Sequence, residues 1–489
     1  MKNRKSLGVN ASLNILRTIL SLLSPLLTYP YISRILGAEN IGSINYTNSI
    51  IQYFVLLSGL GISTYGIREG AKNVDNKNKL SEFISDCFTI NLIFTVISYL
   101  LFLILLFAFR HQRHYYWLFI IQSFLILFNT IGIDWVNSVF EDYSYITIRT
   151  IVVQTISIIL TFTLIKERDD YLLYAIVTVV STGVVSVLNW LHYRTRVRIK
   201  IEKNPNIRIH FKPIFIFFAN KMAVNIYVNS DTTMLGLFAG DYYVGLYSVS
   251  VKVYTIIKNL LAAFYTVYIP RLAYLENSNE KKFKELYSNL ISIMTLIILP
   301  ASIGLLFLSK EIVLLLFSNE YKQASSSLAI LSVAIIFAIY GGLVSSVYDV
   351  VKGQEKTILK STVYSAVLNV SINLIILPIY KANGAALTTL LAEAFNFIFC
   401  LNKSKGIFSF IEVKNVFNNL MHSLIGCFEI GVIVFTINNI SDSVLFVCVS
   451  TVIISVIIYS LTLYLLKNPF ALEFKEYLNN KISSTRRRL

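Results

Sequence analysis

The sequence predicts an all-α polytopic membrane protein with about 14 transmembrane helices. Its 489 residues are 55% hydrophobic and 14% charged, with a mean hydropathy of +0.64. A soluble protein of this composition would have too few charged groups to cover its apolar surface. Apolar runs of about 20 residues recur along the whole chain, and each is long enough to cross about 30 Å of hydrocarbon as a helix. A large soluble domain is therefore not expected.

The apolar segments follow one another with short connections. Their boundaries carry an error of a few residues, as element ends always do in predictions of this kind. The expected spans are roughly 7–33, 41–62, 83–108, 115–133, 145–165, 171–193, 213–237, 244–268, 286–308, 324–348, 361–379, 383–401, 417–438 and 443–466.

The distribution of lysine and arginine predicts the orientation. With the N-terminus inside, the cytoplasmic segments hold 30 of these residues and the outer segments hold 8. This bias is the positive-inside pattern, so both termini are expected in the cytoplasm. It also accounts for the net charge of +16 without any role in nucleic-acid binding. The basic loop 194–212 and the terminal Arg486–Arg488 are expected either to touch anionic lipid head groups or to act only as topology determinants.

The loop 194–212 is the longest polar break, and related segments lie on either side of it. The stretch "LGAENIGSINYTNSI" (36–50) resembles "FAGDYYVGLYSVSVKV" (238–253), with a glycine opening the next helix in both, Gly42 and Gly245. Parallel repeats of this kind predict two pseudo-symmetric six-helix bundles around a central cavity. The expected parts are an N-terminal bundle (1–193), a cytoplasmic linker (194–212), a C-terminal bundle (213–401), two peripheral helices (402–466) and a basic tail (467–489).

Several predicted helices carry a polar face at membrane depth. In "NKMAVNIYVNSDTTM" (220–234) the polar residues recur every three or four positions, which places them on one side of a helix. Lys221 lies about 13 Å inside its span, where a lipid-facing lysine would cost about 2.5–3.5 kcal/mol. The faces are expected to point into a water-filled interior. Their members are Asn10, Asn14, Arg17, Asn45, Asn48, Gln52, Lys221, Asn225, Asn229, Tyr247, Lys252, Tyr254 and Lys258.

Cations outnumber acids within the spans, which indicates an anionic cargo. The cations are Arg17, Arg149, Lys221, Lys252 and Lys258; the acids are Asp231, Glu393 and Glu429. An alternative stays open, in which Arg17 and Lys221 only pair with carboxylates such as Asp231 and tie helices together. Asp231, Glu393 and Glu429 are candidates for H⁺ or Na⁺ coupling. For Glu393 and Glu429 the alternative is a hydrogen bond to a neighbouring helix.

Three longer stretches resemble a known family. They are "YPYISRILGAENIGSINYTNSIIQYFVLLSGLGISTYGIRE" (29–69), "GIDWVNSVFEDYSYITIR" (132–149) and "NLIILPIYKANGAALTTLLAE" (373–393). The chain is similar through these stretches to Wzx-type polysaccharide flippases of the multidrug/oligosaccharidyl-lipid/polysaccharide exporter superfamily. In the first stretch the matching positions are Arg34, Gly37, Gly42, Tyr53, Gly61, Gly66 and Arg68. One departure is that "VKGQEKTILK" (351–360) lacks the acidic pair Glu141 and Asp142 of the first half.

The resemblance implies a transporter of the bacterial cytoplasmic membrane, not an enzyme. Its implied cargo is a polyprenyl-diphosphate-linked oligosaccharide, moved to the outer leaflet for capsule, exopolysaccharide or O-antigen assembly, with polymerase machinery as a candidate partner. The cations, Arg17, Arg149, Lys221, Lys252 and Lys258, would hold the diphosphate. The sugar would meet Tyr247 and Tyr254 and the amides Asn10, Asn14, Asn45, Asn48, Gln52, Asn225 and Asn229.

Two other functions stay open at this point. A cation-coupled drug or metabolite exporter of the same fold would favour an acidic cavity, whereas this chain places lysine and arginine in its spans. An outer-face polysaccharide polymerase or ligase would need a sizeable outer loop, and the longest one expected is about 309–323. The sequence has no Walker-type phosphate loop and no H-E-x-x-H motif, so no cofactor or metal is expected.

Overall fold

The computed structural model describes residues 7–202, 205–473 and 475, with side-chain positions from Ser24 onward except those of residues 113 and 208. The chain forms two compact units, Met1–Ser248 and Val249–Leu489. The division falls inside α9 (Asp241–Thr266), whereas the sequence places the boundary between bundles at 194–212, so the bundle limits stay a prediction.

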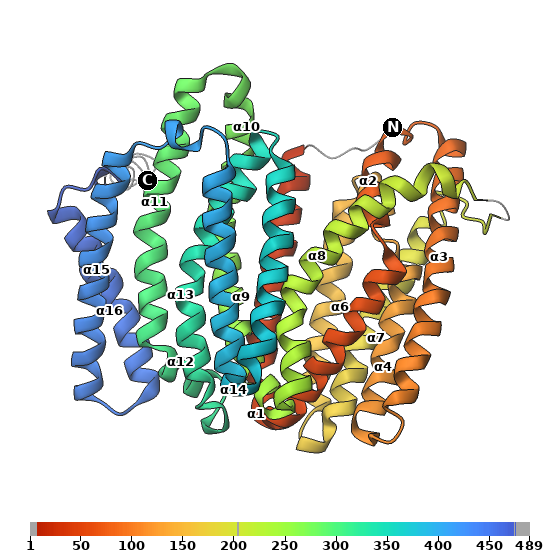
Figure 1. The fold of residues 1–489 in the computed structure, drawn as a ribbon, viewed down its shortest axis with the longest axis horizontal. Helices are drawn as coiled ribbons and strands as arrows, with labels where there is room; N and C mark the ends of the chain where they lie inside the picture. The colour runs from red at the N-terminus through yellow and green to blue at the C-terminus, as the bar shows by residue number, and fades with distance from the viewer. Residues whose placement is uncertain (1–6, 203–204, 474, 476–489) are drawn as a thin grey trace, which may run out of the picture. The chain divides into compact units, whose positions relative to one another are not determined.

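The N-terminal unit is entirely helical in its described part (Figure 1). Its helices before α9 are α1 (Leu7–Gly59), α2 (Ile62–Lys72), α3 (Lys77–Ala108), α4 (Arg113–Gly132), α5 (Trp135–Val139), α6 (Tyr143–Leu164), the 3-10 turn η1 (Arg168–Asp170), α7 (Tyr171–Tyr193) and α8 (Ile207–Ala239).

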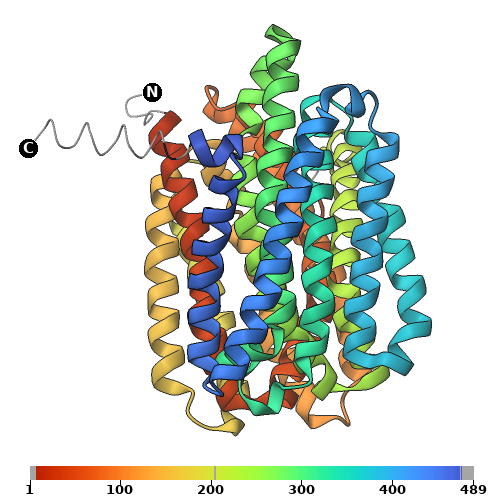
Figure 2. The ribbon, with the colours of Figure 1, turned by 90° about the vertical axis from the view of Figure 1, so that its left-hand side faces the viewer.

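The C-terminal unit continues from α9 and is also helical throughout its described residues. Its elements are α10 (Ile269–Ser278), α11 (Glu280–Phe307), α12 (Ser309–Leu316), η2 (Asn319–Tyr321), α13 (Ala324–Gly342), the π-helical turn η3 (Leu343–Asp349), α14 (Glu355–Lys403), η4 (Ile407–Phe410), α15 (Val413–Ile440) and α16 (Val444–Leu465). The last two helices run side by side (Figure 2).

Eleven helical segments in the described chain are long and apolar enough to cross a membrane. Their outward surfaces confirm an all-helical membrane protein, because α16 exposes Ile453, Val456 and Ile457 while it buries Thr451 and Ser455. This polarity is the reverse of a soluble helix and suits contact with lipid tails. The count is lower than the expected 14 because α1 and α14 each contain two expected spans, and α8 falls outside the eleven.

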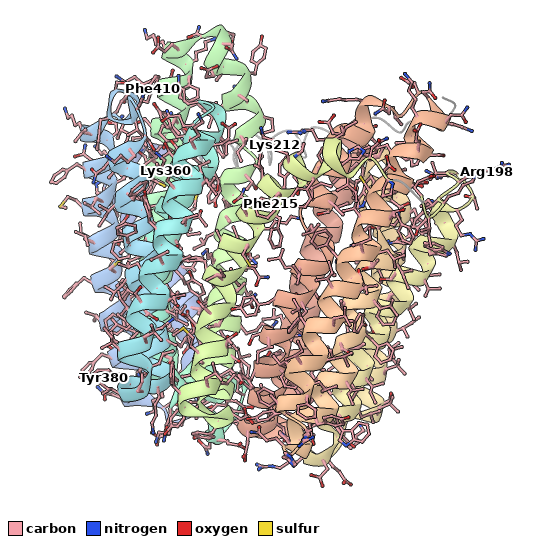
Figure 3. All side chains as sticks on the ribbon, turned by 45° about the vertical axis from the view of Figure 1, so that its right-hand side comes forward. Arg198, Lys212, Phe215, Lys360, Tyr380 and Phe410 are labelled. Atoms are coloured by element: carbon pink, nitrogen blue, oxygen red, sulfur yellow. The ribbon has the colours of Figure 1, made fainter. Side chains whose placement is uncertain are left out.

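Breaks in α1 and α14 separate the paired spans. Gly37 (φ 78°) interrupts α1, and Lys381 (φ 50°) interrupts α14. A positive φ is easy for glycine but costly for lysine, so the second break depends on its surroundings. In the C-terminal unit, Lys360 and Tyr380 lie at opposite ends of the first arm of α14 (Figure 3). That arm is therefore long enough to cross the unit before the chain bends.

A reciprocal glycine contact supports the internal repeat. A Cβ on Gly42 would lie 1.8 Å from the carbonyl oxygen of Asp241, and a Cβ on Gly245 would lie 1.9 Å from that of Ala38. The two glycines are related by the offset of the repeat, and so are Ala38 and Asp241. Each turn therefore packs on the other through the same surface, as in a local two-fold contact. Only glycine allows both backbones to approach so closely.

Two polar clusters join helices within the N-terminal unit, one at the beginning of α8 and one just before α6. His210, buried in the first turn of α8, lies 2.8 Å from the Tyr65 hydroxyl and 3.4 Å from Asp86. Lys212 and Phe215 follow it near the beginning of the same helix (Figure 3). These contacts attach α8 to α2 and α3 within the N-terminal unit.

The loop before α6 contains the second cluster. Asp142 caps α6 by accepting from the Tyr145 backbone N–H, and it also lies 3.0 Å from His192 and 2.6 Å from Arg196. Burial alone would raise the pKa of Asp142, but the hydrogen bond with His192 and the charge of Arg196 lower it below its usual value. The carboxylate is therefore held in its charged form.

Candidate functional site

A polar cavity of about 250 Å³ lies within the N-terminal unit. It forms where α1 ends and α2 begins, with further walls from α3, α4, α5 and α8. The positive φ of Leu60 (45°) turns the chain sharply there, so that the last turn of α1 and the first of α2 both face the hollow. Its lining residues are Gln52, Val55, Leu56, Gly59, Leu60, Ile62, Ser63, Asn91, Asn129, Ile133, Asp134, Trp135, Lys221 and Asn225.

Lys221 is the lysine of this cavity, and it lies in the middle of α8. Its side chain is half-buried, and its ammonium group donates a hydrogen bond to the Ser63 hydroxyl. Within the part of the chain that the structure describes, no carboxylate lies within ion-pair distance of it. A half-buried cation that is satisfied by one neutral hydroxyl retains the capacity to bind an anion.

A second hollow, of about 380 Å³, extends along the polar face of α8. It shares Leu56, Lys221 and Asn225 with the first cavity and adds Asn229. The expected spacing of the polar face is thus realised, because these three polar residues of α8 all border open space. Gln52, expected on the second span, borders the first cavity with Lys221 and Asn225.

Four polar residues of the first cavity were not expected from the sequence: Ser63, Asn91, Asn129 and Asp134. Asn91 and Asn129 are amides within largely apolar spans. Polar groups at membrane depth are costly unless they have partners or face water, so their presence in such runs was a usable signal. Periodicity alone did not single them out, because their polar neighbours at helical spacing, Thr95 on α3 and Gln122 on α4, do not line the cavity.

Arg149 does not face this cavity as a free cation. Its guanidinium lies 3.0 Å from Asp134 and also contacts the Asn189 side chain, and only 4% of the side chain is exposed. Asn189 in turn accepts from Asn137. A buried arginine in such a network is neutralised, so its main visible role is to join α5, α6 and α7. The predicted contact with a diphosphate stays untested.

Lys258 and Glu393 form an ion pair within the C-terminal unit. The two side chains approach to 2.6 Å, and the Tyr254 hydroxyl donates to the same carboxylate oxygen at 2.9 Å. The carboxylate is nearly fully buried and the lysine side chain is 32% exposed. The Tyr254 ring is 6% exposed and has no open face for a sugar in this structure. Lys252 lies on the same helix and is half-buried.

Most of the remaining expected residues of the N-terminal unit form hydrogen bonds within the protein. Tyr247 is 3% exposed and donates to Asp231 at 2.8 Å, so its ring is also closed to a sugar here. Asn45 donates to the Ile41 carbonyl and the Tyr29 hydroxyl, and Asn48 accepts from Gln52.

Four expected residues remain. Glu429, in the C-terminal unit, accepts from Thr462 at 2.5 Å and so joins α15 to α16. Asn10, Asn14 and Arg17 lie on the first arm of α1, and their side chains fall outside the described residues.

An apolar cavity of about 420 Å³ lies within the C-terminal unit. Its walls come from α9, α11, α12, α15 and α16. Among its lining residues are Pro300, Gly304, Leu308, Ile312, Ile430 and Val456. Its interior offers few polar atoms, so it suits a hydrocarbon and excludes an anion.

The family model described as "Polysaccharide biosynthesis protein" matches residues 7–276, which include the whole polar cavity. The chain belongs to this family. The match confirms the sequence-based resemblance at the level of the family. It covers α1 through α9 and most of α10.

Relatives of this family member include putative O-antigen transporters. One from Shigella dysenteriae is 22% identical over 389 residues, covering 78% of this chain and 96% of the relative. One from Escherichia coli K12 is 23% identical over 382 residues, covering 76% and 90%. A probable low-salt glycan biosynthesis flippase of Haloferax volcanii is 25% identical over 233 residues, 47% of this chain and 48% of that one.

Solved structures show the fold. The lipid II flippase MurJ in an inward closed conformation matches with a TM-score of 0.72 and 15% identity, covering 94% of this chain and 99% of that one. An inward-facing multidrug resistance MATE transporter matches with a TM-score of 0.59 and 15% identity, covering 83% and 99%. The chain therefore has the fold of these transporters.

Proposed function

We propose that this protein is a flippase that moves a polyprenyl-diphosphate-linked oligosaccharide from the cytoplasmic to the outer leaflet. The observation that carries the proposal is Lys221, a lysine in the middle of a membrane helix that faces a polar cavity without a carboxylate partner among the described residues. Keeping such a charge away from water costs free energy unless a ligand compensates it. The names of the relatives support the same cargo class.

The diphosphate would bind to Lys221, together with Arg17 and Lys252 as further candidates. Charge-assisted hydrogen bonds to phosphate oxygens are stronger than neutral ones in a medium of low dielectric constant. Arg149 and Lys258 would contribute only after exchanging their carboxylates for phosphate, which makes them secondary candidates. The amides along α8 and at Gln52 would replace water around the sugar hydroxyls.

The prenyl tail would occupy the apolar cavity of the C-terminal unit or remain in lipid beside it. Each methylene that leaves water contributes about 0.8 kcal/mol, so a hydrocarbon chain prefers an apolar wall. The cavity borders α15 and α16, the two helices expected to be peripheral. The polar and apolar parts of the cargo would thus contact chemically different regions of the protein.

The topology proposed here has fourteen spans, with α1 and α14 each crossing twice and α8 crossing once. Both termini would lie in the cytoplasm of a bacterial cell, as the distribution of basic residues indicates. Two six-helix bundles would rock around a central cavity to expose it to each side in turn. Anionic lipids would contact the basic loop 194–212, and the polysaccharide polymerase would receive the cargo outside.

The membrane potential favours this direction of transport. Moving two negative charges outward from a negative interior gains about 4–5 kcal/mol per 100 mV. Coupling to H⁺ or Na⁺ through Asp231, Glu393 or Glu429 would add to this driving force. A drug exporter for organic cations is less consistent with a cavity that is lined by Lys221 and whose lining carboxylate, Asp134, is already paired with Arg149.

Lys221→Ala provides the test. Export of the polymer should fall about a hundredfold or more in cells lacking the native gene, because the charge-assisted contact is lost. Lys212→Ala is the matched control, since it removes an exposed lysine from the same helix. Arg17→Ala should behave like Lys221→Ala. Immunoblots of membranes report the protein level, and normal export by Lys221→Ala at a normal level would reject the proposal.

A further inference from the structure

Asn91 on α3 and Asn129 on α4 line the polar cavity. Their hydrogen bonds show which way each side-chain amide group points. The Asn91 side-chain N–H donates to the Ser58 carbonyl oxygen, and that of Asn129 donates to the Val55 carbonyl oxygen at 3.3 Å. A backbone carbonyl only accepts, so each contact must be made by the amide nitrogen. The amide oxygens therefore point away from these bonds.

These contacts have a structural role, which explains the amide nitrogen of each side chain. Helix α1 ends at Gly59, and the carbonyls of a final helical turn lack partners of their own. Asn91 satisfies one of them, that of Ser58, whereas Asn129 adds a contact to the Val55 carbonyl, which also accepts from the Ser58 hydroxyl. This role explains the two nitrogens but leaves the two oxygens unexplained.

The amide oxygens of Asn91 and Asn129 have no hydrogen-bond donor among the residues that the structure describes. Both residues line the cavity, and Asp134 adds a carboxylate to the same lining. The cavity thus has two chemically different sides. Lys221 and Ser63 offer donors, whereas Asn91 and Asn129 offer acceptors, and the Asp134 carboxylate is paired with Arg149.

We propose that Asn91 and Asn129 bind the first sugar of the cargo, accepting hydrogen bonds from its hydroxyl or acetamido groups through their side-chain oxygens. The inference rests on the proposed function, because Lys221 would hold the adjoining diphosphate. The volume of about 250 Å³ is below the range of about 300–1,000 Å³ for drug-sized ligands and suits about one sugar ring.

The same geometry specifies the class of the first sugar. A neutral or acetamido sugar presents donors to the acceptor side of the cavity. A uronic acid would instead place its carboxylate near the two amide oxygens, where unpaired acceptors repel it. The first sugar is therefore uncharged, whatever the rest of the repeat unit contains.

The test measures binding of lipid probes to the full-length protein in nanodiscs by native mass spectrometry. The probes are polyprenyl diphosphate alone, the same lipid with one N-acetylglucosamine, and the same lipid with one glucuronic acid. Wild type should bind the N-acetylglucosamine lipid about tenfold more tightly than the bare diphosphate, and the glucuronic acid lipid no more tightly. Asn91→Ala and Asn129→Ala should lose the tenfold gain and keep bare-diphosphate binding.

Asn73→Ala is the matched control. Asn73 also donates its amide N–H to a helix carbonyl, that of Glu69 at 3.2 Å, but it does not line the cavity. It should retain the full gain from the sugar. Retained bare-diphosphate binding also shows that the two cavity variants are folded, so misfolding cannot imitate the expected result.

The other outcomes separate the inference from the function on which it rests. If both cavity variants keep the sugar gain, or lose binding of all three lipids, the sugar contact is wrong. Tighter binding of the glucuronic acid lipid than of the N-acetylglucosamine lipid would overturn it as well. If Lys221→Gln binds the bare diphosphate like wild type, or if wild type binds none of the probes, the proposed function itself fails.

Discussion

Lys221 in the N-terminal unit and Lys258 in the C-terminal unit are both lysines within long helices, yet their surroundings differ. Lys258 lies 2.6 Å from Glu393, whereas Lys221 reaches only the Ser63 hydroxyl. The cavities differ in the same sense, since the one beside Lys221 is polar and the one described in the C-terminal unit is apolar. A cation with a carboxylate partner serves the fold first, and a cation without one is available to a ligand.

The comparison predicts a large stability effect at Glu393. Glu393→Leu should lower the free energy of unfolding by about 2–4 kcal/mol, because it leaves Lys258 without its partner; the value is discounted for the 32% exposure of the lysine side chain. Lys258→Met combined with Glu393→Leu should recover most of the loss. Thermal unfolding followed by size-exclusion chromatography measures both variants.

Lys221→Gln is the counterpart in the other unit. It removes a charge that has no carboxylate partner among the described residues, so it should leave the unfolding temperature close to that of wild type. A loss of stability as large as that of Glu393→Leu would erase the distinction between the two lysines.

A smaller effect is expected in the apolar cavity. Gly304 borders it, and a Cβ there would meet nothing closer than Ile430, at 4.0 Å. Gly304→Leu should fill part of the hollow and reduce export by about fifteen- to sixtyfold, since two or three methylenes of the tail would lose contacts of about 0.8 kcal/mol each. Gly304→Ala is the control and should export normally, because it adds one methyl group to open space. Equal export by the two variants would show that the tail does not use this cavity.

The smallest effect is expected at Asp142. Its ion pairs with His192 and Arg196 lie outside the membrane spans, so they can be compared with the ion pair of Lys258 inside a span. The pKa of Asp142 in the folded protein is lower than the usual 3.8, so the charged form stabilises the fold above that pH. The contribution, about 0.5–1 kcal/mol, should disappear as the pH falls through the folded pKa, below about 4. Wild type should therefore melt at a higher temperature than Asp142→Asn at pH 6, and the difference between the two proteins should shrink at pH 3. A constant gap between them would contradict the assignment.

Residues that are close in sequence were predicted well. The polar face of α8 follows from helical spacing alone, and Lys221, Asn225 and Asn229 do border open space. The resemblance between 36–50 and 238–253 was also visible in the sequence, through Gly42 and Gly245, whereas the positive φ shared by Gly37 and Gly240 appears only in the structure. Hydropathy located the spans, although it could not show that α1 and α14 continue through their breaks.

Contacts between distant residues could not be predicted in the same way. Glu393 is 135 residues from Lys258, and nothing in either segment indicates the other. Arg149 resembled a free cation in its span, and only the packing of α5, α6 and α7 brings Asp134 and Asn189 to it. Asn91 and Asn129 became part of the cavity because α3 and α4 pack against the last turns of α1, where both amides donate to backbone carbonyls.

The sequence by itself determined that the chain is a helical membrane protein, where its helices lie and which of their faces are polar, because these properties depend on residues within one or two helical turns. The tertiary structure decided which cations have carboxylate partners, which amide oxygens reach a cavity, and that one unit encloses a polar hollow while the other encloses an apolar one. Those outcomes depend on which helices pack together, and helix packing joins side chains that local periodicity cannot relate.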